Sequence, residues 1–567
     1  MFEFEILPNV VDAAVEAAGK NRGIYEYKFS CHPNREHVTL LTRIQCINCF
    51  TVWNHTVDFD RQLHPEWFSS KCVSSVLKGM PLHCLIGQDG RNVLTIAVSD
   101  VKNRVEIKSG LHEEDATITC KVVFYPPVDQ HEIYEAIIRL DTRQMPYYDC
   151  IYNASEWWER YGYGCAYVPD NAKRPMYSTW YSFHQALTPE EIVQECRLAK
   201  ALGMDTIILD DGWQTENMQR GYAYCGDWEP VRSKIGNMEE LVKMVHAMDM
   251  KLILWYNIAF MGECAKNVDV FDGMYMDAGV RGRYTFDPRF HKVRTYLTEL
   301  LVNAVNDWHL DGVKIDFVDS FIRSEDDTVS RDMDFPVLEE AVEQLVKGIS
   351  DTLHRLNPEI MIEFRQNYIG PIMRKYANIF RVADCPNDAI RNRLGVINLR
   401  LTSGTCAVHS DMLMWNYDEP VETAAKQIIN ILFSVPQVSV RIERLCPEHY
   451  QMLQFYLSFW QKYRTLFVER PIAAECPEAN YSKVCAIYNQ TQIFVCYSDN
   501  IVQLCGAEQF VVVNGTAKET FYIDSSIQLA YTIRDCMGQI VRCGETKAPI
   551  FVCQIPVSGV AEFCRLS

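Results

Sequence analysis

The sequence lacks the features that mark several large classes of protein. Lys and Arg total 55 against 74 Asp and Glu, the formal net charge is −19, and no run rich in Lys and Arg occurs. A nucleic-acid-binding surface needs clustered positive charge, so we expect no nucleic-acid partner. No apolar run reaches the roughly 18 residues of a membrane-spanning helix, so we expect no membrane partner. An acidic surface suits a neutral substrate better than a polyanion.

Motifs for export, metals and nucleotides are also missing. The first five residues include two glutamates, and no basic stretch followed by an apolar one marks a secretory signal. With 22 cysteines and no such signal, we expect reduced thiols and a cytoplasmic location. Cys46-x-x-Cys49 has no second pair or His partners, and HExxH, a P-loop and a strand-linked GxGxxG are absent. We therefore expect no metal and no cofactor.

The two ends of the 567-residue chain have the pattern of β-structure. In the first part, short alternating stretches such as 92–98 and 116–124 are separated by turn residues, which is typical of an antiparallel sandwich. Similar stretches return after about residue 470. We expect an N-terminal β-sandwich over 1–145 and a small C-terminal β-sandwich over 466–567.

Between these ends, short apolar strands alternate with helices. One helix has a clear start, with Thr188 as N-cap, Pro189 at the first helical position and Glu191 completing a capping box. Eight strands are predicted, at 176–180, 206–209, 251–256, 312–315, 359–364, 379–383, 406–412 and 437–441. Eight β/α units predict a (β/α)₈ TIM barrel over 146–465, with 146–174 as a linker. The chain is thus expected to combine an α/β domain with two all-β domains.

Acidic and aromatic residues gather where the predicted barrel strands end, which is where such barrels place their active sites. They are Trp180, Asp210, Asp211, Trp213, Trp255, Lys314, Asp316, Arg365 and Asp384. Carboxylates accept hydrogen bonds from sugar hydroxyls, and glycoside cleavage requires two carboxyl groups that flank the bond. A single strand-end Asp often only caps the next helix. The concentration at one face favours a site for a neutral oligosaccharide or glycoside.

The order and spacing of these segments resemble the retaining α-galactosidases of glycoside hydrolase family 36, in the melibiase clan, as a divergent member. The resemblance spans roughly residues 175–415. The segments that carry it are Leu209-Asp210-Asp211-Gly212-Trp213, Gly226-Asp227-Trp228, Leu254-Trp255, the run from Asp311 to Phe317, and Asp384 with Arg391 seven residues on. The resemblance implies an exo-acting retaining α-galactosidase.

The resemblance also implies a role for each catalytic carboxylate: Asp316 as the nucleophile and Asp384 as the acid/base. Lys314 lies two residues before Asp316, so on a strand both side chains point the same way, and its charge favours an ionised Asp316. Asp384 must start protonated to donate to the leaving oxygen. We expect apolar surroundings or the charge of Asp316 to raise the pKa of Asp384.

A glycone pocket follows from the same resemblance. Its implied members are Asp210 and Asp211 for the 4- and 6-hydroxyls, Lys314 for the 3- and 4-hydroxyls, Trp180, Trp213 and Trp255 for the walls, and Arg391 to orient the acid/base loop. The family has a Cys- and Gly-rich stretch after its fifth strand that lines the 2-hydroxyl. Here residues 364–371 read Phe-Arg-Gln-Asn-Tyr-Ile-Gly-Pro and place Arg365 inside the site. The reaction is expected to be preserved and the pocket redrawn.

Several alternatives stay open at this point. A clan-related transglycosylase would use the same two aspartates, with a sugar instead of water as acceptor. The glycone could be N-acetylgalactosamine or a pentose, a choice that depends on residues 365–371. A non-catalytic sugar-binding barrel would have lost a carboxylate, whereas Asp316 and Asp384 are both present. A metal- or phosphate-dependent barrel enzyme would need a Schiff-base Lys or several strand-end His residues. An oligomer is possible, because the N-terminal sandwich could supply a subunit contact.

Overall fold

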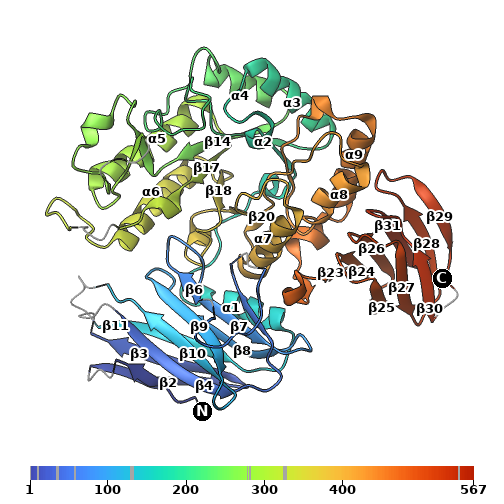
Figure 1. Cartoon of the computed structure of the whole chain (residues 1–567). Coiled ribbons are helices and arrows are strands. Elements are labelled where there is room, and N and C mark those ends of the chain that lie inside the picture. The colour runs from blue at the N-terminus through green and yellow to red at the C-terminus, as the bar shows by residue number, and fades with distance from the viewer. Residues whose placement is uncertain are drawn as a thin grey trace.

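The computed structural model describes residues 2–8, 12–32, 37–56, 59–69, 71–127, 133–277, 279, 282–323, 328–546 and 549–566. The chain forms an N-terminal sandwich, a central barrel ringed by helices and a C-terminal group of sheets, which are blue, green to orange, and red in Figure 1. This is the predicted fold class. All 22 cysteines lie within the described ranges and are free thiols. Among the described residues, no helix is long and apolar enough to cross a membrane.

Two antiparallel sheets make up the N-terminal sandwich. Their strands are β1 (Glu5–Leu7), β2 (Ala13–Asn21), β3 (Ile24–Cys31), β4 (Val38–Gln45), β5 (Thr51–Asn54), β6 (Lys71–Ser74), β7 (Leu82–Ile86), β8 (Asn92–Val98), β9 (Val105–His112), β10 (Thr117–Phe124) and β11 (Tyr134–Asp141). The strand orders are β1-β4-β10-β9-β6 and β2-β3-β11-β8-β7-β5. Alternate residues, such as Tyr27, Phe29 and Cys31 of β3, enter a core shared by both sheets because strand side chains alternate between faces.

Eight parallel strands form the barrel, and each matches a predicted one. They are β12 (Met176–Ser178), β13 (Thr206–Leu209), β14 (Lys251–Asn257), β17 (Gly312–Asp316), β18 (Met361–Arg365), β19 (Ile379–Arg381), β20 (Ala407–His409) and β21 (Gln437–Val438). The order is β20-β19-β18-β17-β14-β13-β12-β21. Single parallel bridges, His409 to Val435 and Leu413 to Val438, lie between β20 and β21 and complete the ring.

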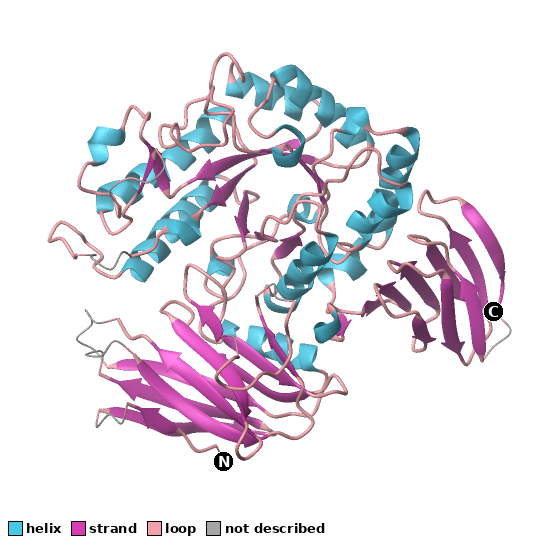
Figure 2. Cartoon of the chain, in the orientation of Figure 1, coloured by secondary structure: helices cyan, strands magenta, loops and turns pink. Residues whose placement is uncertain are grey.

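Helices surround the barrel on its outer side (Figure 2). They are α3 (Pro189–Ala201), α4 (Met238–His246), α5 (His291–Trp308), α6 (Leu338–Leu356), α7 (Ala389–Thr402), α8 (Val421–Ile429) and α9 (Pro447–Lys462). The one-turn helix α2 (Trp180–Phe183) directly follows β12. The start of α3 is as predicted: the Thr188 side chain accepts a hydrogen bond from the Glu191 N–H, and Pro189 follows the cap. A small hairpin of β15 (Phe260–Gly262) and β16 (Arg283–Thr285) lies in the connection after β14. The connections in this part of the chain also contain short helical turns: η1 (Asp170–Lys173), η2 (Val268–Phe271), η3 (Val318–Ser320), η4 (Met373–Lys375), η5 (Ile442–Arg444) and the π-turn η6 (Thr465–Glu469).

The segment 146–174, expected as a linker, instead contains the helix α1 (Tyr147–Glu159). Its apolar residues, including Ile151, Ala154 and Trp158, are buried. The Trp158 indole N–H donates to the carbonyl of Val98 in β8, 2.8 Å away, and α1 also packs against α7. Local sequence does not reveal the docking of this helix, because its tryptophans and tyrosines pack against two other parts of the chain. It joins the sandwich to the barrel.

The C-terminal region is a β-structure of two sheets. Its elements are β22 (Ala473–Glu475), η7 (Pro477–Ala479), β23 (Lys483–Tyr488), β24 (Thr491–Cys496), β25 (Ile501–Leu504), β26 (Gln509–Asn514), β27 (Thr520–Ser525), β28 (Leu529–Arg534), β29 (Ile540–Glu545), β30 (Ile550–Gln554) and β31 (Val560–Arg565). The orders are β22-β23-β24-β26-β31-β28-β29 and β25-β27-β30. A separate core includes Phe510, Ile523 and Phe563.

Inside the barrel, strand alternation separates an apolar layer from a charged one. Buried apolar side chains from six strands form the lower layer: Met176, Ile208, Ile253, Met361, Ile379 and Ala407. Gly312 lies at this level, where a Cβ would approach the Met361 carbonyl oxygen to 2.5 Å. Residues two positions further along the same strands point to the same side. They are Ser178, Asp210, Trp255, Lys314, Glu363, Arg381 and His409.

Candidate active site

Asp316, the last residue of β17, lies at the centre of the charged end of the barrel. Its Oδ1 accepts hydrogen bonds from Arg365 Nε at 2.5 Å and from the Phe317 N–H at 2.7 Å. Its Oδ2 accepts one from the indole N–H of Trp255 at 3.1 Å. The structure therefore brings together three predicted site residues from the ends of β14, β17 and β18.

The charge of Asp316 is fixed by its neighbours. Burial by itself raises the pKa of this carboxyl, but Arg365, followed by Lys314 and Arg381, outweighs burial and lowers the pKa to about 2. Asp316 is consequently ionised at any pH near neutrality. The expectation that Lys314 helps to keep this carboxylate charged agrees with this direction, although Arg365 contributes more.

Arg365 is held in place from several sides. Its guanidinium lies over the rings of Phe317 and Tyr368, at 5.3 and 5.5 Å from their centroids, and bonds to the Gln366 carbonyl at 2.7 Å. Asp319 makes a longer contact at 3.4 Å. The Arg365 side chain is 16% exposed. Arg365 is thus a fixed cation beside Asp316.

Lys314 and Asp210 form a buried ion pair beneath Asp316. Lys314 Nζ lies 2.6 Å from Asp210 Oδ2, and both side chains are 4% exposed. Burial raises the pKa of Asp210, and Lys314 offsets only part of that effect. Glu363 of β18 lies 4.0 Å from the same ammonium group. A sugar hydroxyl that reached this pair would meet both a donor and an acceptor.

Asp211 is oriented differently from its neighbour. Its carboxylate oxygens accept from Gln214 Nε2 at 2.6 Å and Gln185 Nε2 at 2.9 Å. The ammonium group of Lys234 binds the carbonyl oxygens of Gln185, Gly212 and Thr215 in the same place. Burial raises the pKa of Asp211 to about 6. Asp211 therefore connects the loops that follow β12 and β13. That Asp211 also contacts a sugar hydroxyl stays a prediction.

Asp384 lies just beyond β19, and 54% of its side chain is exposed. Arg381 Nη1 donates to its Oδ1 at 2.9 Å. Burial and the charge of Asp316 act to raise the pKa of Asp384, but Arg381 and Lys314 outweigh them, so that pKa is lowered. The expectation of a raised pKa was wrong, because a buried guanidinium three residues upstream faces this carboxylate.

Arg391 does not take the position expected for it. It lies in the first turn of α7, where its backbone N–H donates to Asp388 at 2.9 Å, and its side chain is exposed. Among the described residues, no hydrogen bond or ion pair joins its side chain to Asp384. Arg381 fills that place, and sequence reasoning missed it. The available signal was an arginine inside the apolar run Ile379-Phe380-Arg381-Val382, at a position that points into the barrel.

The three tryptophans differ in their access to the site. Trp255 contacts Asp316 directly. Trp180 is partly exposed at the start of α2, with its ring centroid 4.7 Å from that of His184 in a T-shaped arrangement. Trp213 has no exposed surface, because Trp228, Tyr256 and Trp308 enclose its ring. Trp213 therefore cannot present a face to a sugar, and its predicted place in the pocket wall was wrong. It supports Trp255 instead, donating to the Trp255 carbonyl at 3.0 Å.

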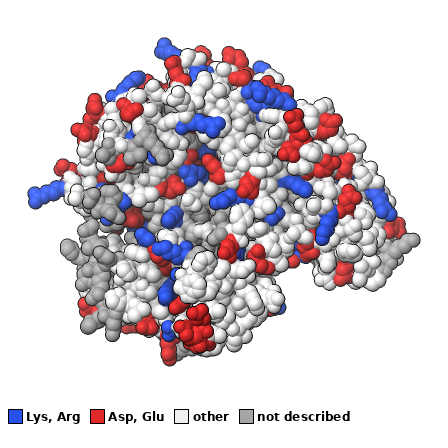
Figure 3. Space-filling view, in the orientation of Figure 1, with Lys and Arg blue, Asp and Glu red and all other residues white. Residues whose placement is uncertain are grey.

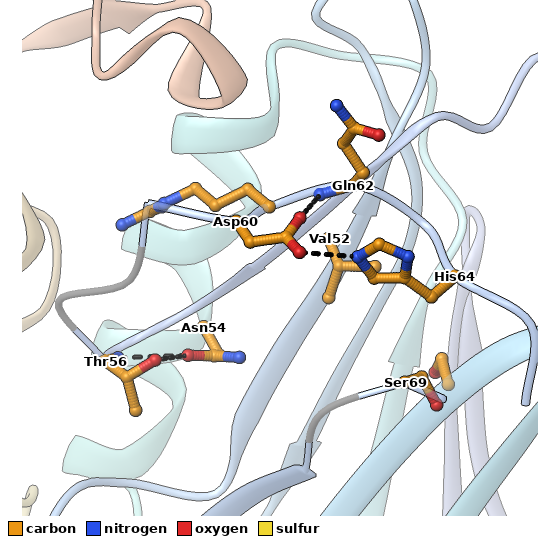
Figure 4. A pocket seen from close by; sticks show the side chains of 9 residues that line it. Val52, Asn54, Thr56, Asp60, Gln62, His64 and Ser69 are labelled. Atoms are coloured by element: carbon orange, nitrogen blue, oxygen red, sulfur yellow. Dashed lines mark hydrogen bonds and ion pairs between the residues drawn. The ribbon is translucent and has the colours of Figure 1, made fainter. Parts of the chain in front are cut away.

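A small hollow in the N-terminal sandwich also contains polar residues. Asp60 and His64 interact there at 2.8 Å, near Ser69 (Figure 4). Its volume of about 10 Å³ suits a single water molecule and excludes a sugar. On the face shown in Figure 3, acidic and basic side chains are interspersed over the barrel.

No family model matches the sequence. Among curated proteins, the bifunctional α-galactosidase/sucrose kinase AgaSK of Mediterraneibacter gnavus is 26% identical over 169 residues. That match covers 28% of this chain and 16% of AgaSK, so the chain matches well under two thirds of this relative.

Solved structures extend the similarity to the whole chain. The α-galactosidase from Lactobacillus brevis superposes with a TM-score of 0.65 at 12% identity, covering 100% of this chain and 85% of that one. A variant of the family 36 α-galactosidase AgaA from Geobacillus stearothermophilus, in complex with raffinose, has a TM-score of 0.66 at 13% identity, with 96% and 80% covered. This chain has the fold of the family 36 α-galactosidases. The galactosidase domain of AgaSK gives a TM-score of 0.64 at 13% identity, with 100% and 86% covered. The predicted likeness to family 36 is confirmed for the fold.

Proposed function

We propose that this protein is a glycoside hydrolase that removes terminal α-galactosyl groups with retention of configuration. One observation carries the proposal: Asp316 is held as a carboxylate between Arg365 and Trp255 at the end of β17. Asp384 lies at the same end of the barrel, close enough for the charge of Asp316 to act on it. Two carboxyl groups are what glycoside cleavage requires. The shared fold supports the proposal.

The two oxygens of Asp316 suit different tasks in the first step. Oδ1 is occupied by Arg365 and the Phe317 N–H, whereas Oδ2 accepts only the indole N–H among the described contacts. Oδ2 is therefore the better nucleophile. It attacks the anomeric carbon, the bond to the leaving oxygen breaks, and the Asp384 carboxyl gives its proton to that oxygen.

The second step returns both carboxylates to their starting state. Asp384, now ionised, takes a proton from a water molecule, and the oxygen of that water attacks the anomeric carbon. The bond to Asp316 breaks, and the sugar leaves with its original anomeric configuration. The half-exposed position of Asp384 gives water access for this step.

The groups beneath Asp316 are suited to bind the glycone. Lys314 and Asp210 supply a donor and an acceptor for ring hydroxyls, and Trp180 supplies a partly exposed aromatic face. The lower apolar layer closes the barrel below them. A site closed at its base would hold one terminal sugar, so we propose exo action on a neutral oligosaccharide or glycoside. Arg365 faces the region in which the resemblance places the 2-hydroxyl.

A second candidate, an α-glycosidase for another glycone, is favoured by Arg365 itself. Its guanidinium replaces the small residues expected beside the sugar 2-position and offers donors there. An acetamido carbonyl would accept from such a donor as well as a hydroxyl would. N-acetylgalactosamine and a pentose therefore remain alternatives to galactose.

The test is hydrolysis of p-nitrophenyl α-galactoside, the matching N-acetyl-α-galactosaminide and a pentoside, by wild type and by Asp316→Ala. We expect release from the α-galactoside and a loss of at least about 10³-fold in Asp316→Ala, since covalent catalysis is removed. The matched control is Asp319→Ala, which removes a nearby carboxylate that also contacts Arg365. It should keep activity within about tenfold.

The anomer released first distinguishes the mechanisms. NMR should detect the α-anomer first, and a β-anomer would contradict retention. Unchanged hydrolysis by Asp316→Ala would contradict the assigned nucleophile. Transfer to an added acceptor sugar that exceeds hydrolysis would identify a transglycosylase.

A further inference from the structure

Arg381 has an arrangement that the two-carboxylate mechanism does not explain. It ends β19, its side chain is 1% exposed, and it contacts three carboxylates. Nη1 lies 2.9 Å from Asp384 Oδ1 and 2.7 Å from Asp411 Oδ1, and Nε lies 3.3 Å from Glu363 Oε1. Lys314 lies 4.0 Å from Glu363 and pairs with Asp210, so two cations are shared by four acids, three of which are at most 4% exposed. At least one of the acids gains by keeping its proton.

Asp411 connects this cluster to the loop of the proposed acid/base. Its Oδ2 accepts from the N–H of Cys385, the residue after Asp384, at 2.7 Å and from the Tyr181 hydroxyl at 3.0 Å. Its own backbone is fixed by Asn392 of α7, which bonds to both its N–H and its carbonyl. The side chain and the following peptide of Asp384 are thus both tied to the Arg381–Asp411 pair.

The two acids on Arg381 differ in their access to water. Asp411 is fully buried, whereas 54% of the Asp384 side chain is exposed. Burial raises the pKa of Asp411 to about 6, and the pKa of Asp384 is lowered mainly by Arg381 against the effect of burial. In the unliganded protein at slightly acidic pH, the proton therefore sits on Asp411.

We propose, on the basis of the proposed function, that Arg381 and Asp411 are positioning residues that hold the Asp384 loop and determine which carboxyl carries a proton. Arg381 Nη1 has two hydrogens and three acceptors, since the Val382 carbonyl lies at 2.9 Å as well. The acceptors compete for it. When Asp411 is charged, it takes more of Arg381 and repels negative charge on Asp384. A charged Asp411 thereby favours the protonated form of Asp384, which the leaving oxygen needs.

The test compares wild type with Asp411→Asn, which keeps the shape of the side chain and removes its charge. Arg381 is then free to pair with Asp384, whose carboxyl loses its proton at lower pH. The basic limb of the kcat/KM profile should move down by about one pH unit, with an approximately tenfold loss at pH 7.5. Other titratable groups that face Asp384, namely Asp316, Lys314 and Tyr181, are unchanged in this variant.

The leaving group provides a second readout that a structural defect would not imitate. A 2,4-dinitrophenyl glycoside needs no proton on departure, whereas a methyl or natural glycoside does. Asp411→Asn should lose at least about tenfold more activity on the poor leaving group than on the activated one. The matched control is Asp388→Asn, which removes an exposed charge from the same loop and retains a capping side chain for α7. It should leave both profiles as in wild type.

The outcomes separate the two proposals. Equal losses on both substrates, with the basic limb unmoved, would overturn the positioning role while leaving the hydrolase intact. If wild type cleaves no glycoside, the proposed function fails, and the ¹³C NMR titration of aspartate carboxyls decides the positioning role by itself. Asp384, assigned by comparison with Asp384→Asn, should titrate at lower pH in Asp411→Asn. An unchanged midpoint would overturn the role.

Discussion

The two oxygens of Asp316 have different surroundings, and the difference comes from single side chains. Arg365 and the Phe317 N–H bind one oxygen, and the Trp255 indole binds the other. A charge-assisted bond from a guanidinium is stronger than one from a neutral indole. The weaker contact leaves Oδ2 available for attack and still fixes its direction. Trp255 thereby has a task that its ring surface alone would not give it.

Replacing Trp255 with Phe tests this assignment. The variant retains a buried ring but loses the hydrogen bond to Oδ2, so kcat should fall about tenfold, about 1.4 kcal/mol, with little change in KM. Steady-state kinetics on the α-galactoside measures both constants. Trp228→Phe is the matched control, since Trp228 packs against Trp255 at 5.6 Å without reaching Asp316. A kcat for Trp255→Phe equal to that of the control would contradict the role.

At the scale of elements, the connection after β13 depends on a buried carboxylate. Asp211 joins Gln185, from the connection after α2, to Gln214 in the loop beyond β13, and Lys234 binds carbonyl oxygens of both segments. These loops border the ion pair of Asp210 and Lys314. Asp210 and Asp211 thus have different roles, because Asp210 faces the barrel interior and Asp211 faces the loops.

Asp211→Asn should change how stability depends on pH. Burial raises the pKa of Asp211 from 3.8 to about 6, so between pH 4 and 6 the folded protein keeps a proton that the unfolded chain has released. The folded state binds more protons in this window, and its stability falls as pH rises, by about 3 kcal/mol in total. The variant lacks this loss. The Tm of the variant minus that of wild type should therefore increase from pH 4 to pH 7.5, as measured by differential scanning fluorimetry.

Gln214→Ala serves as the control for that experiment. It removes a hydrogen-bond donor from Asp211 and keeps the titrating carboxyl. Its Tm should follow the pH dependence of wild type or a steeper one. A constant Tm difference between wild type and Asp211→Asn across this range would contradict the assignment.

At the scale of the whole molecule, the N-terminal sandwich supports the barrel close to the site. The Gly79 N–H, in the loop between β6 and β7, donates to the Asn367 carbonyl at 2.7 Å, two residues after Arg365. A Cβ on Gly370 would lie 2.6 Å from the Gly79 carbonyl oxygen. The sandwich also reaches the C-terminal part of the chain, where the Trp53 indole donates to the Tyr481 hydroxyl at 2.8 Å. The loop that carries Arg365 is thereby held from outside the barrel.

Gly370→Ala should disturb the site from this interface. The added methyl must displace backbone in the sandwich or in the 366–370 loop, so we expect about a tenfold fall in kcat/KM together with a lower Tm. Gly348→Ala in α6 is the control, since its nearest neighbour is Thr298 Oγ1 at an ordinary 3.6 Å. That helical substitution should stabilise by about 0.5–1 kcal/mol and leave kinetics unchanged. Unaltered kinetics in Gly370→Ala would show that the sandwich does not set the position of Arg365.

The sequence by itself determined the local features of this protein. Strand alternation and capping residues are properties of neighbouring positions, which is why the eight barrel strands and the start of α3 at Thr188 could be predicted. The clustering of Asp210, Lys314 and Asp316 followed from the rule that barrel strands end at one face.

Only the tertiary structure decided which partners these residues meet. Trp213 is enclosed by rings from three other segments, and Asp384 faces Arg381 instead of Arg391. Asp411 reaches Arg381 and Cys385 across 30 and 26 residues of sequence. Burial, and with it the direction in which a carboxyl's pKa moves, is a sum over such distant contacts. The order of side chains along a strand does not contain that sum. The charge of Asp316 could be predicted from Lys314 two residues away, but the protonation of Asp384 could not.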